Sequence, residues 1–168
     1  MHQILEQTTS THEVHPQKSQ MSLLEYRELV RSVPISESVR DFAIRLVEAT
    51  HPTSEKSNGT AFALSPLLEK LKTPQKINAE EMKSITNRII RYGASPRAAQ
   101  ALLLAGKVFA LLAGRFAVST EDIQKAAIPV LRHRIILSFE GQAERVEKES
   151  LIKALLFHTK EGGDLPSK

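Results

Sequence analysis

Hydrophobic residues recur at every third or fourth position along most of this chain, which is the spacing of an amphipathic α-helix. The pattern predicts helices at residues 22–33, 36–51, 64–71, 78–93, 95–113, 119–131 and 147–158. Residues 134–139 are expected to be extended or irregular. Taken together, the pattern predicts an all-α fold, a helical bundle.

Residues that favour helix starts stand at several predicted N-termini. Ser22, followed three residues later by Glu25, forms a capping-box pattern in which each side chain accepts a hydrogen bond from the other residue's backbone amide. Ser36, Asn78 and Ser119 stand at three later helix starts.

The helix that begins at Ser95 is the most strongly apolar one, because residues 98–113 are hydrophobic on nearly every side. A helix without a polar face is normally buried, so the other helices are expected to surround this central helix. Ser95 is a favoured N-cap, Pro96 a favoured first helical residue, and Gly114 a left-handed stop. Pro129, inside the next helix, is expected to kink it or end it early.

Composition narrows the fold and the kinds of site. Aromatic residues make up 5% of the chain, so the core must be built from Leu, Ile, Val and Ala. The absence of cysteine excludes disulfides and thiolate metal sites, and makes a cytoplasmic location the simplest expectation. Residues 1–20 lack the order of a signal peptide. The longest apolar stretch is interrupted by Lys107 and is shorter than the roughly 20 residues of a membrane span, so no membrane segment is expected.

The chain divides into three parts by composition. Residues 1–21 are mostly polar and are expected to form a linker. Residues 22–158 contain every predicted helix and are expected to form one helical domain, with a loop at 52–60. Residues 159–168 contain Gly, Pro and Lys, and a disordered tail is expected there.

Charge is distributed unevenly along the chain. Residues 83–134 contain nine basic and two acidic side chains, a net charge of +7, whereas the remainder has 14 basic and 17 acidic side chains, a net charge of −3. A concentrated positive field indicates an anionic partner, either nucleotide phosphates or a nucleic acid. The alternative is a set of solvated surface arginines, and charge alone does not separate the two.

Arg97 is the strongest candidate for a functional side chain. It falls in the first turn of the central helix, where the helix dipole makes a cation unfavourable by about 0.3–1 kcal/mol. An anion held by the guanidinium and the free backbone amides would explain an arginine at this position. The alternative is a side chain that points sideways into solvent at little cost.

Arg132, His133 and Arg134 form a second cluster just past the helix that contains Pro129. There they could contact a phosphate or an acidic neighbouring surface. His133 has no second His or carboxylate at ligand spacing beside it, so a packing or hydrogen-bonding role is simpler and no metal site is predicted.

The chain lacks the motifs of a hydrolytic centre. It has no Gly-x-x-x-x-Gly-Lys-Ser/Thr run to cradle phosphates, and no hydrophobic run that ends in paired acids to hold Mg²⁺. It also has no Gly-x-Ser-x-Gly elbow and no cysteine nucleophile. We therefore expect this chain alone not to be catalytic.

Several runs resemble the lid domain of MoxR-family AAA+ ATPases. The most specific is Tyr-Gly-Ala-Ser-Pro-Arg-Ala-Ala at 92–99, which an Ala/Leu helix follows. The other runs are Val-Arg-Asp-Phe at 39–42, Leu-Val-Glu-Ala-Thr at 46–50, Ala-Gly-Arg-Phe-Ala-Val at 113–118, Glu-Asp-Ile at 121–123 and Val-Leu-Arg-His-Arg-Ile at 130–135. Gln-Ile-Leu-Glu at 3–6 resembles the stretch that leaves the ATPase core.

In that family, the arginine of the Gly-Ala-Ser-Pro-Arg-Ala run is the sensor-2 residue. The resemblance implies that Arg97, with Ser95 and Pro96 on the phosphate side, contacts the γ-phosphate of ATP from the lid and couples hydrolysis to lid movement. It also implies that ATP and Mg²⁺ bind the intact ATP hydrolase but are not held tightly by this chain. The chain is then expected to be a fragment without the nucleotide-binding core.

The resemblance also implies partners. They are the cognate core in cis, the neighbouring subunits of a hexamer and, as candidates, von Willebrand factor A domain proteins. The task that the resemblance implies is chaperone-like remodelling of other proteins. Residues 52–91 exceed the short loop usual at this position, so they are a candidate insertion.

Two other functions stay open. A basic helical module could bind nucleic acid through residues 83–134, but no helix-turn-helix pattern is evident and few aromatic residues are available for stacking. The third reading is a protein–protein interaction scaffold of packed helices.

Overall fold

The computed structural model describes residues 21–53 and 64–161 of the chain. The predictions for the run at 3–6, for most of the 52–60 loop and for the last residues of the tail lie outside these ranges.

The described residues form helices joined by short connections, which confirms the all-α class. The helices are α2 (Leu23–Ser32), α3 (Glu37–Glu48), α4 (Leu64–Lys70), the 3₁₀ turn η1 (Pro74–Lys76), α5 (Ala79–Ile89), α6 (Pro96–Leu112), α7 (Thr120–Leu131), α8 (Phe139–Ala143) and α9 (Lys148–Glu161). In this part of the chain the extended segments are β1 (Ile90–Tyr92) and β2 (Ile136–Leu137), which pair as a two-stranded antiparallel sheet.

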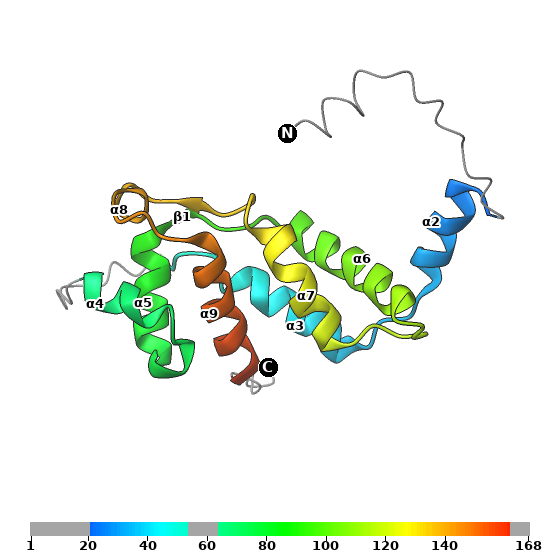
Figure 1. The fold of residues 1–168 in the computed structure, drawn as a ribbon, viewed down its shortest axis with the longest axis horizontal. Coiled ribbons are helices and arrows are strands. Elements are labelled where there is room, and N and C mark those ends of the chain that lie inside the picture. The colour runs from blue at the N-terminus through cyan, green and yellow to red at the C-terminus, as the bar shows by residue number, and fades with distance from the viewer. Residues whose placement is uncertain (1–20, 54–63, 162–168) are drawn as a thin grey trace, which may run out of the picture.

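The molecule is elongated, with α6 and α7 side by side and running in opposite directions near its middle (Figure 1). α3 packs against both of them and against α9, and α9 in turn contacts α5 and α7. α2 packs on α6 at one end, and α4, α5 and α8 lie at the other end (Figure 1). The small sheet connects the two halves, because β1 leads from α5 toward α6 and β2 leads from α7 to α8.

The core is aliphatic, as the composition predicts. Leu46 of α3, Ile85 of α5, Leu102 of α6, Ile123 of α7 and Leu151 of α9 are fully buried. Burial of each such side chain contributes about 1.5–3 kcal/mol to folding. The shared aliphatic core therefore holds the helices from both halves of the sequence in one domain.

The capping box predicted at Ser22 is present, and Asn78, predicted as a helix-start residue, forms another. At α2, the amide of Glu25 donates to Ser22 Oγ at 3.2 Å, and the amide of Ser22 donates to a Glu25 carboxylate oxygen at 2.6 Å. At α5, the amide of Glu81 donates to Asn78 Oδ1 at 2.8 Å, and the Glu81 carboxylate accepts from the Asn78 amide at 3.1 Å. Local sequence chemistry therefore sets these two helix starts.

The helix predicted at 78–93 ends earlier than the sequence indicates. α5 stops at Ile89 because residues 90–92 leave the helix to pair with β2. Ser138 is hydrogen-bonded to two carbonyls at the end of α5. Its hydroxyl donates to the Arg88 carbonyl at 2.5 Å, and its amide donates to the Ile89 carbonyl at 2.7 Å. Ser138 is about fifty residues from the end of α5 in sequence. The spacing of hydrophobic residues therefore could not show that the helix ends at Ile89.

Two other helix ends bear on the sequence expectation. α7 ends at Leu131, as the predicted range 119–131 has it, so it continues through Pro129 and does not end early there. α9 runs to Glu161, beyond His158, and takes in three residues that the sequence assigns to the tail.

α6 is buried along one face rather than on all sides. Ala98, Leu102, Gly106 and Ala110 recur every four residues and form the buried stripe that faces the neighbouring helices. The opposite side includes Leu104, Val108 and Leu112, which are 47%, 40% and 79% exposed. α6 is thus the helix on which α2, α3 and α7 pack, but they do not enclose it. No helix in the described ranges is long and apolar enough to cross a bilayer.

A buried carboxylate of α7 is hydrogen-bonded to the segment that connects α6 to α7. Asp122 has no exposed side-chain surface, and its two oxygens accept from the Arg115 guanidinium at 2.8 and 2.5 Å. The amide and hydroxyl of Ser119 donate to the same carboxylate at 2.9 and 3.0 Å. Hydrogen bonds from Arg115, followed by those from Ser119, lower the pKa of Asp122 from 3.8 to about 2 despite its burial.

Replacing Asp122 with Asn is expected to lower the free energy of unfolding by about 1–2 kcal/mol at pH 6, because the ion pair with Arg115 is lost. The folded-state pKa lies below the unfolded value of 3.8. The carboxylate's contribution is therefore present above about pH 4 and is lost as the pH falls through about 2. In urea unfolding, the difference between wild type and variant should shrink as the pH is lowered from 5 toward 2.

The matched control is Glu149→Gln, which removes an ion pair with Arg132 whose partners are 45% and 62% exposed. It should change the stability by less than about 0.5 kcal/mol. A stability difference for Asp122→Asn that does not change with pH would contradict the assignment.

Candidate functional site

Arg97 lies in the first turn of α6, as the sequence predicts. Ser95 is the N-cap residue and Pro96 the first residue of the helix. The Ser95 side chain makes no capping hydrogen bond, so the first-turn amides have no side-chain acceptor from the cap. The Arg97 side chain is exposed and makes no ion pair among the described residues. The Ala98 amide is already bonded, since it donates to the Ser95 carbonyl at 2.7 Å. The end of α6 therefore presents an exposed guanidinium at the positive end of the helix dipole, a position suited to an anion.

The turn that precedes Arg97 is attached to the end of α3. The Ala94 amide donates to Thr50 Oγ1 at 2.9 Å, and the Thr50 hydroxyl donates to the Val47 carbonyl at 2.6 Å. Both Ala94 and Thr50 are fully buried. A β-carbon added at Gly93 would lie 2.7 Å from the Thr50 carbonyl oxygen, so only glycine fits against this backbone.

The pairing of β1 with β2 brings the second predicted cluster to the same end of the domain. Tyr92 lies opposite Ile136 in the antiparallel register, so the chain after Tyr92 and the chain before Ile136 lie side by side. The first leads into Arg97 at the start of α6, and the second comes from residues 132–134 at the end of α7. Figure 1 shows both helix ends on the same side of the molecule, next to the sheet.

Within the second cluster the three side chains differ. Arg132 is 62% exposed and forms an ion pair with Glu149 of α9 at 3.6 Å. His133 is exposed. Arg134 is partly buried, and its Nε atom is buried without a hydrogen-bond partner in the described structure. Arg132 is thus paired with α9, whereas the Arg134 Nε atom has no acceptor in the described structure.

Much of the basic segment at 83–134 is already paired. Arg115 binds Asp122, Arg132 binds Glu149, and Arg88 contacts Glu140 of α8 at 3.2 Å. The Lys107 ammonium donates to the Arg31 carbonyl at 2.7 Å. The three ion pairs offset positive charge that binding to nucleic-acid phosphates would need.

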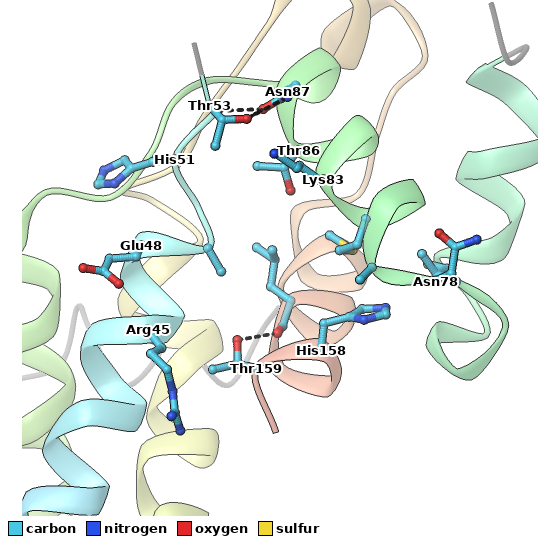
Figure 2. A pocket seen from close by; sticks show the side chains of 15 residues that line it. Arg45, Glu48, His51, Thr53, Asn78, Lys83, Thr86, Asn87, His158 and Thr159 are labelled. Carbon is cyan, nitrogen blue, oxygen red and sulfur yellow. Dashed lines mark hydrogen bonds between the residues drawn. The ribbon is translucent and has the colours of Figure 1, made fainter. Parts of the chain in front are cut away.

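A separate cavity of about 580 Å³ lies between α3, α5 and α9. Its lining is mostly apolar and includes Ala49, Met82 and Leu155. Figure 2 shows Thr53 bonded to Asn87 at one edge; the Thr53 amide donates to the Asn87 side-chain carbonyl at 2.7 Å. No residue of either predicted cluster lines this cavity.

The described residues contain no group of three or more His, Asp or Glu side chains placed to hold a metal ion. The chemistry of the α6 end is that of donors and positive charge, which suits a phosphate and not a cation.

The sequence predicts Arg97 as a candidate site residue, but it does not predict the contacts that hold the turn before it. Thr50 is 44 residues from Ala94, and no local pattern links a hydroxyl at the end of one helix to an amide before another. Gly93 carried a signal, since a glycine before Ser-Pro marks a turn. That signal could not show that the Thr50 backbone occupies the space of a β-carbon.

Replacing Gly93 with Ala should destabilise the domain by about 1–3 kcal/mol, because the new methyl group overlaps the Thr50 backbone. Thermal or urea unfolding measures the loss. Ser95→Ala is the control: it should cost less than about 0.5 kcal/mol, below the usual value for an N-cap, because this side chain makes no capping bond. Equal stability of Gly93→Ala and wild type would show that the turn is not confined as described.

Comparison with known proteins identifies the fold. Residues 82–155 match the family described as the AAA lid domain. The match runs from α5 to α9 and includes both Arg97 and the cluster at 132–134.

Two curated relatives share this region. The chaperone MoxR1 of Mycobacterium tuberculosis is 26% identical over 134 residues, covering 80% of this chain and 29% of that protein. The protein MoxR of Paracoccus denitrificans is 37% identical over 90 residues, covering 54% of this chain and 26% of that protein. The chain therefore spans less than a third of the length of either relative.

A solved structure agrees with these relatives. A protein described as a candidate ATPase from Cytophaga hutchinsonii superposes with a TM-score of 0.60 and 30% identity, covering 80% of this chain and 33% of that one. The resemblance carried by residues 92–99 is thus confirmed: the chain carries an AAA lid domain of the MoxR type.

Proposed function

We propose that this lid closes over ATP held by a nucleotide-binding core, and that Arg97 contacts the γ-phosphate as the sensor-2 residue. The observation that carries the proposal is the exposed Arg97 guanidinium, which makes no ion pair with the described residues, in the first turn of α6. A planar guanidinium offers paired N–H donors that match phosphate oxygens. The positive end of the helix dipole strengthens the same preference.

Ser95 and Pro96 contribute through the backbone. Pro96 fixes the first helical φ angle and has no N–H of its own, and the Ser95 side chain makes no capping bond. The Ala98 amide donates to the Ser95 carbonyl at 2.7 Å, so the Arg97 amide is the first-turn donor proposed to bind the phosphate together with the Arg97 guanidinium. Mg²⁺ is expected to be held on the core side, because the described part of this chain has no cluster of acids to bind it.

Hydrolysis would remove the group that Arg97 binds, so the lid would be held closed more strongly before hydrolysis than after it. α6 packs against α7, and the Arg115–Asp122 ion pair links the connection after α6 to α7. A displacement of Arg97 would therefore move the two helices together. In this way the lid angle would report the state of the nucleotide.

Arg132, His133 and Arg134 are proposed to contact either a phosphate or an acidic surface of a neighbouring subunit. Their support is position, since β1–β2 pairing brings them to the same end of the lid as Arg97.

The whole protein's activity is proposed from the family. We infer an ATP-hydrolysing hexamer with a chaperone-like remodelling role, with von Willebrand factor A domain proteins as candidate partners; one relative is named a chaperone. Residues 1–21 are proposed to lead from the core, and 22–158 to form the lid. Residues 52–91, which include α4, η1 and α5, are proposed as an insertion.

Arg97→Ala, in the protein that combines this lid with its core, should lower kcat for ATP hydrolysis at least about tenfold without unfolding the lid. Arg97→Lys keeps the charge but not the paired donors, and it should restore only part of the activity. Arg91→Ala, which removes another exposed arginine nearby, is the matched control and should leave turnover unchanged. Normal turnover in Arg97→Ala would refute the sensor-2 role.

The chain alone should bind ATP with a Kd weaker than about 1 mM, because one guanidinium and a few amides without a P-loop supply less than about 4 kcal/mol. Isothermal titration calorimetry with the 168-residue chain and ATP measures this directly. Micromolar affinity would mean that the chain holds a nucleotide site of its own.

A further inference from the structure

A single buried hydroxyl links α3 to the turn that begins α6. Thr50 Oγ1 accepts from the Ala94 amide at 2.9 Å and donates to the Val47 carbonyl at 2.6 Å. Neither Thr50 nor Ala94 has any exposed surface. Water therefore cannot replace the hydroxyl as the acceptor for the Ala94 amide without a change in packing.

We propose that Thr50 is the positioning residue that fixes Arg97 for its contact with phosphate, an inference that rests on the sensor-2 role proposed above. Arg97 follows Ala94 by three residues, with the N-cap Ser95 and Pro96 between them. The hydrogen bond to Thr50 therefore holds the last buried residue before the helix that carries the guanidinium.

Thr50 is itself held firmly. It follows α3, whose residues Phe42, Leu46 and Val47 are buried in the core. On the other side of the contact, Gly93 lies so close to the Thr50 carbonyl that no β-carbon fits between them. The turn is thus confined by sterics at Gly93 and oriented by a hydrogen bond at Ala94. A misplacement of about 1 Å in a positioned group can cost roughly 100-fold in rate.

A purely structural role for Thr50 would give a different result, and Thr159 provides the comparison. Thr159 is also buried, at 7% exposure, but its hydroxyl donates only to the Leu155 carbonyl of its own helix, at 2.7 Å. Thr159→Val therefore removes a buried hydroxyl without leaving an amide of another segment unpaired. It controls for the general cost of such a change.

The test is a double-mutant cycle in the ATPase that contains this lid and its core. Thr50→Val keeps the side-chain shape but removes the acceptor, and it should lower kcat about tenfold with a smaller change in KM. Thr50→Ser should restore most of the activity, and Thr159→Val should stay within about twofold of wild type. Because Thr50 acts through Arg97, the variant with both Thr50→Val and Arg97→Ala should be no slower than Arg97→Ala alone.

Two outcomes overturn the positioning role alone: unchanged kcat in Thr50→Val, or a double variant slower than Arg97→Ala by the full factor of the single change. Normal activity in Arg97→Ala would instead remove the sensor-2 role and the positioning role together. The two failures are therefore distinguishable. If Thr50→Val does not fold, Thr50→Ala, which leaves room for a water molecule, replaces it in the cycle.

Hydrogen exchange on the chain itself gives an independent readout. The Ala94 amide should be protected in wild type and Thr50→Ser and should exchange at least about tenfold faster in Thr50→Val. The Leu151 amide, which bonds to the Glu147 carbonyl at 3.2 Å, serves as the internal reference and should not change. Equal protection of Ala94 in all three proteins would overturn the proposal.

Discussion

The close packing of α6 on α7 is the constraint on which the rest of the lid depends. A β-carbon at Gly106 would lie 2.8 Å from Ile123 Cδ1 and 3.0 Å from Val118 Cγ1, so the two helices meet at a position that only glycine fills without displacement. Glycine inside a helix costs about 1 kcal/mol relative to alanine. Ile123 packs in the space that the missing side chain of Gly106 leaves. Its burial offsets that cost, because burying such a side chain contributes about 1.5–3 kcal/mol to the stability of the fold.

The two ends of this helix pair are held by different forces. At the α6–α7 connection, the buried Asp122 carboxylate takes donors from Arg115 and Ser119. At the opposite end, backbone pairing of β1 with β2 aligns the start of α6 with the end of α7. Electrostatics and backbone hydrogen bonds thus fix both ends of a pair whose middle is held by packing. Arg97 lies at the end that the strand pairing holds, in the first turn of α6.

The lid contains the arginine but not the other groups that phosphate chemistry requires. Its described residues supply no acidic cluster for a cation, and its sequence has no phosphate-binding loop. A lid of this kind can contribute through how accurately it places one guanidinium. Thr50 and Gly93 hold the turn before α6, and with it the helix start that contains Arg97.

Local patterns were sufficient for the all-α class, the caps at Ser22 and Asn78, and the position of Arg97 in the first turn of a helix, because each depends on residues within a few positions of one another. They failed where the partner was distant. The end of α5, the β1–β2 pairing and the contact of Thr50 with Ala94 join segments 44 or more residues apart. Folding also left α6 exposed on one side, since apolar composition shows that a helix can be buried but not which neighbours reach it. The position of Arg97 at a helix start could therefore be predicted from local residues, whereas the way that this helix start is held depends on long-range contacts.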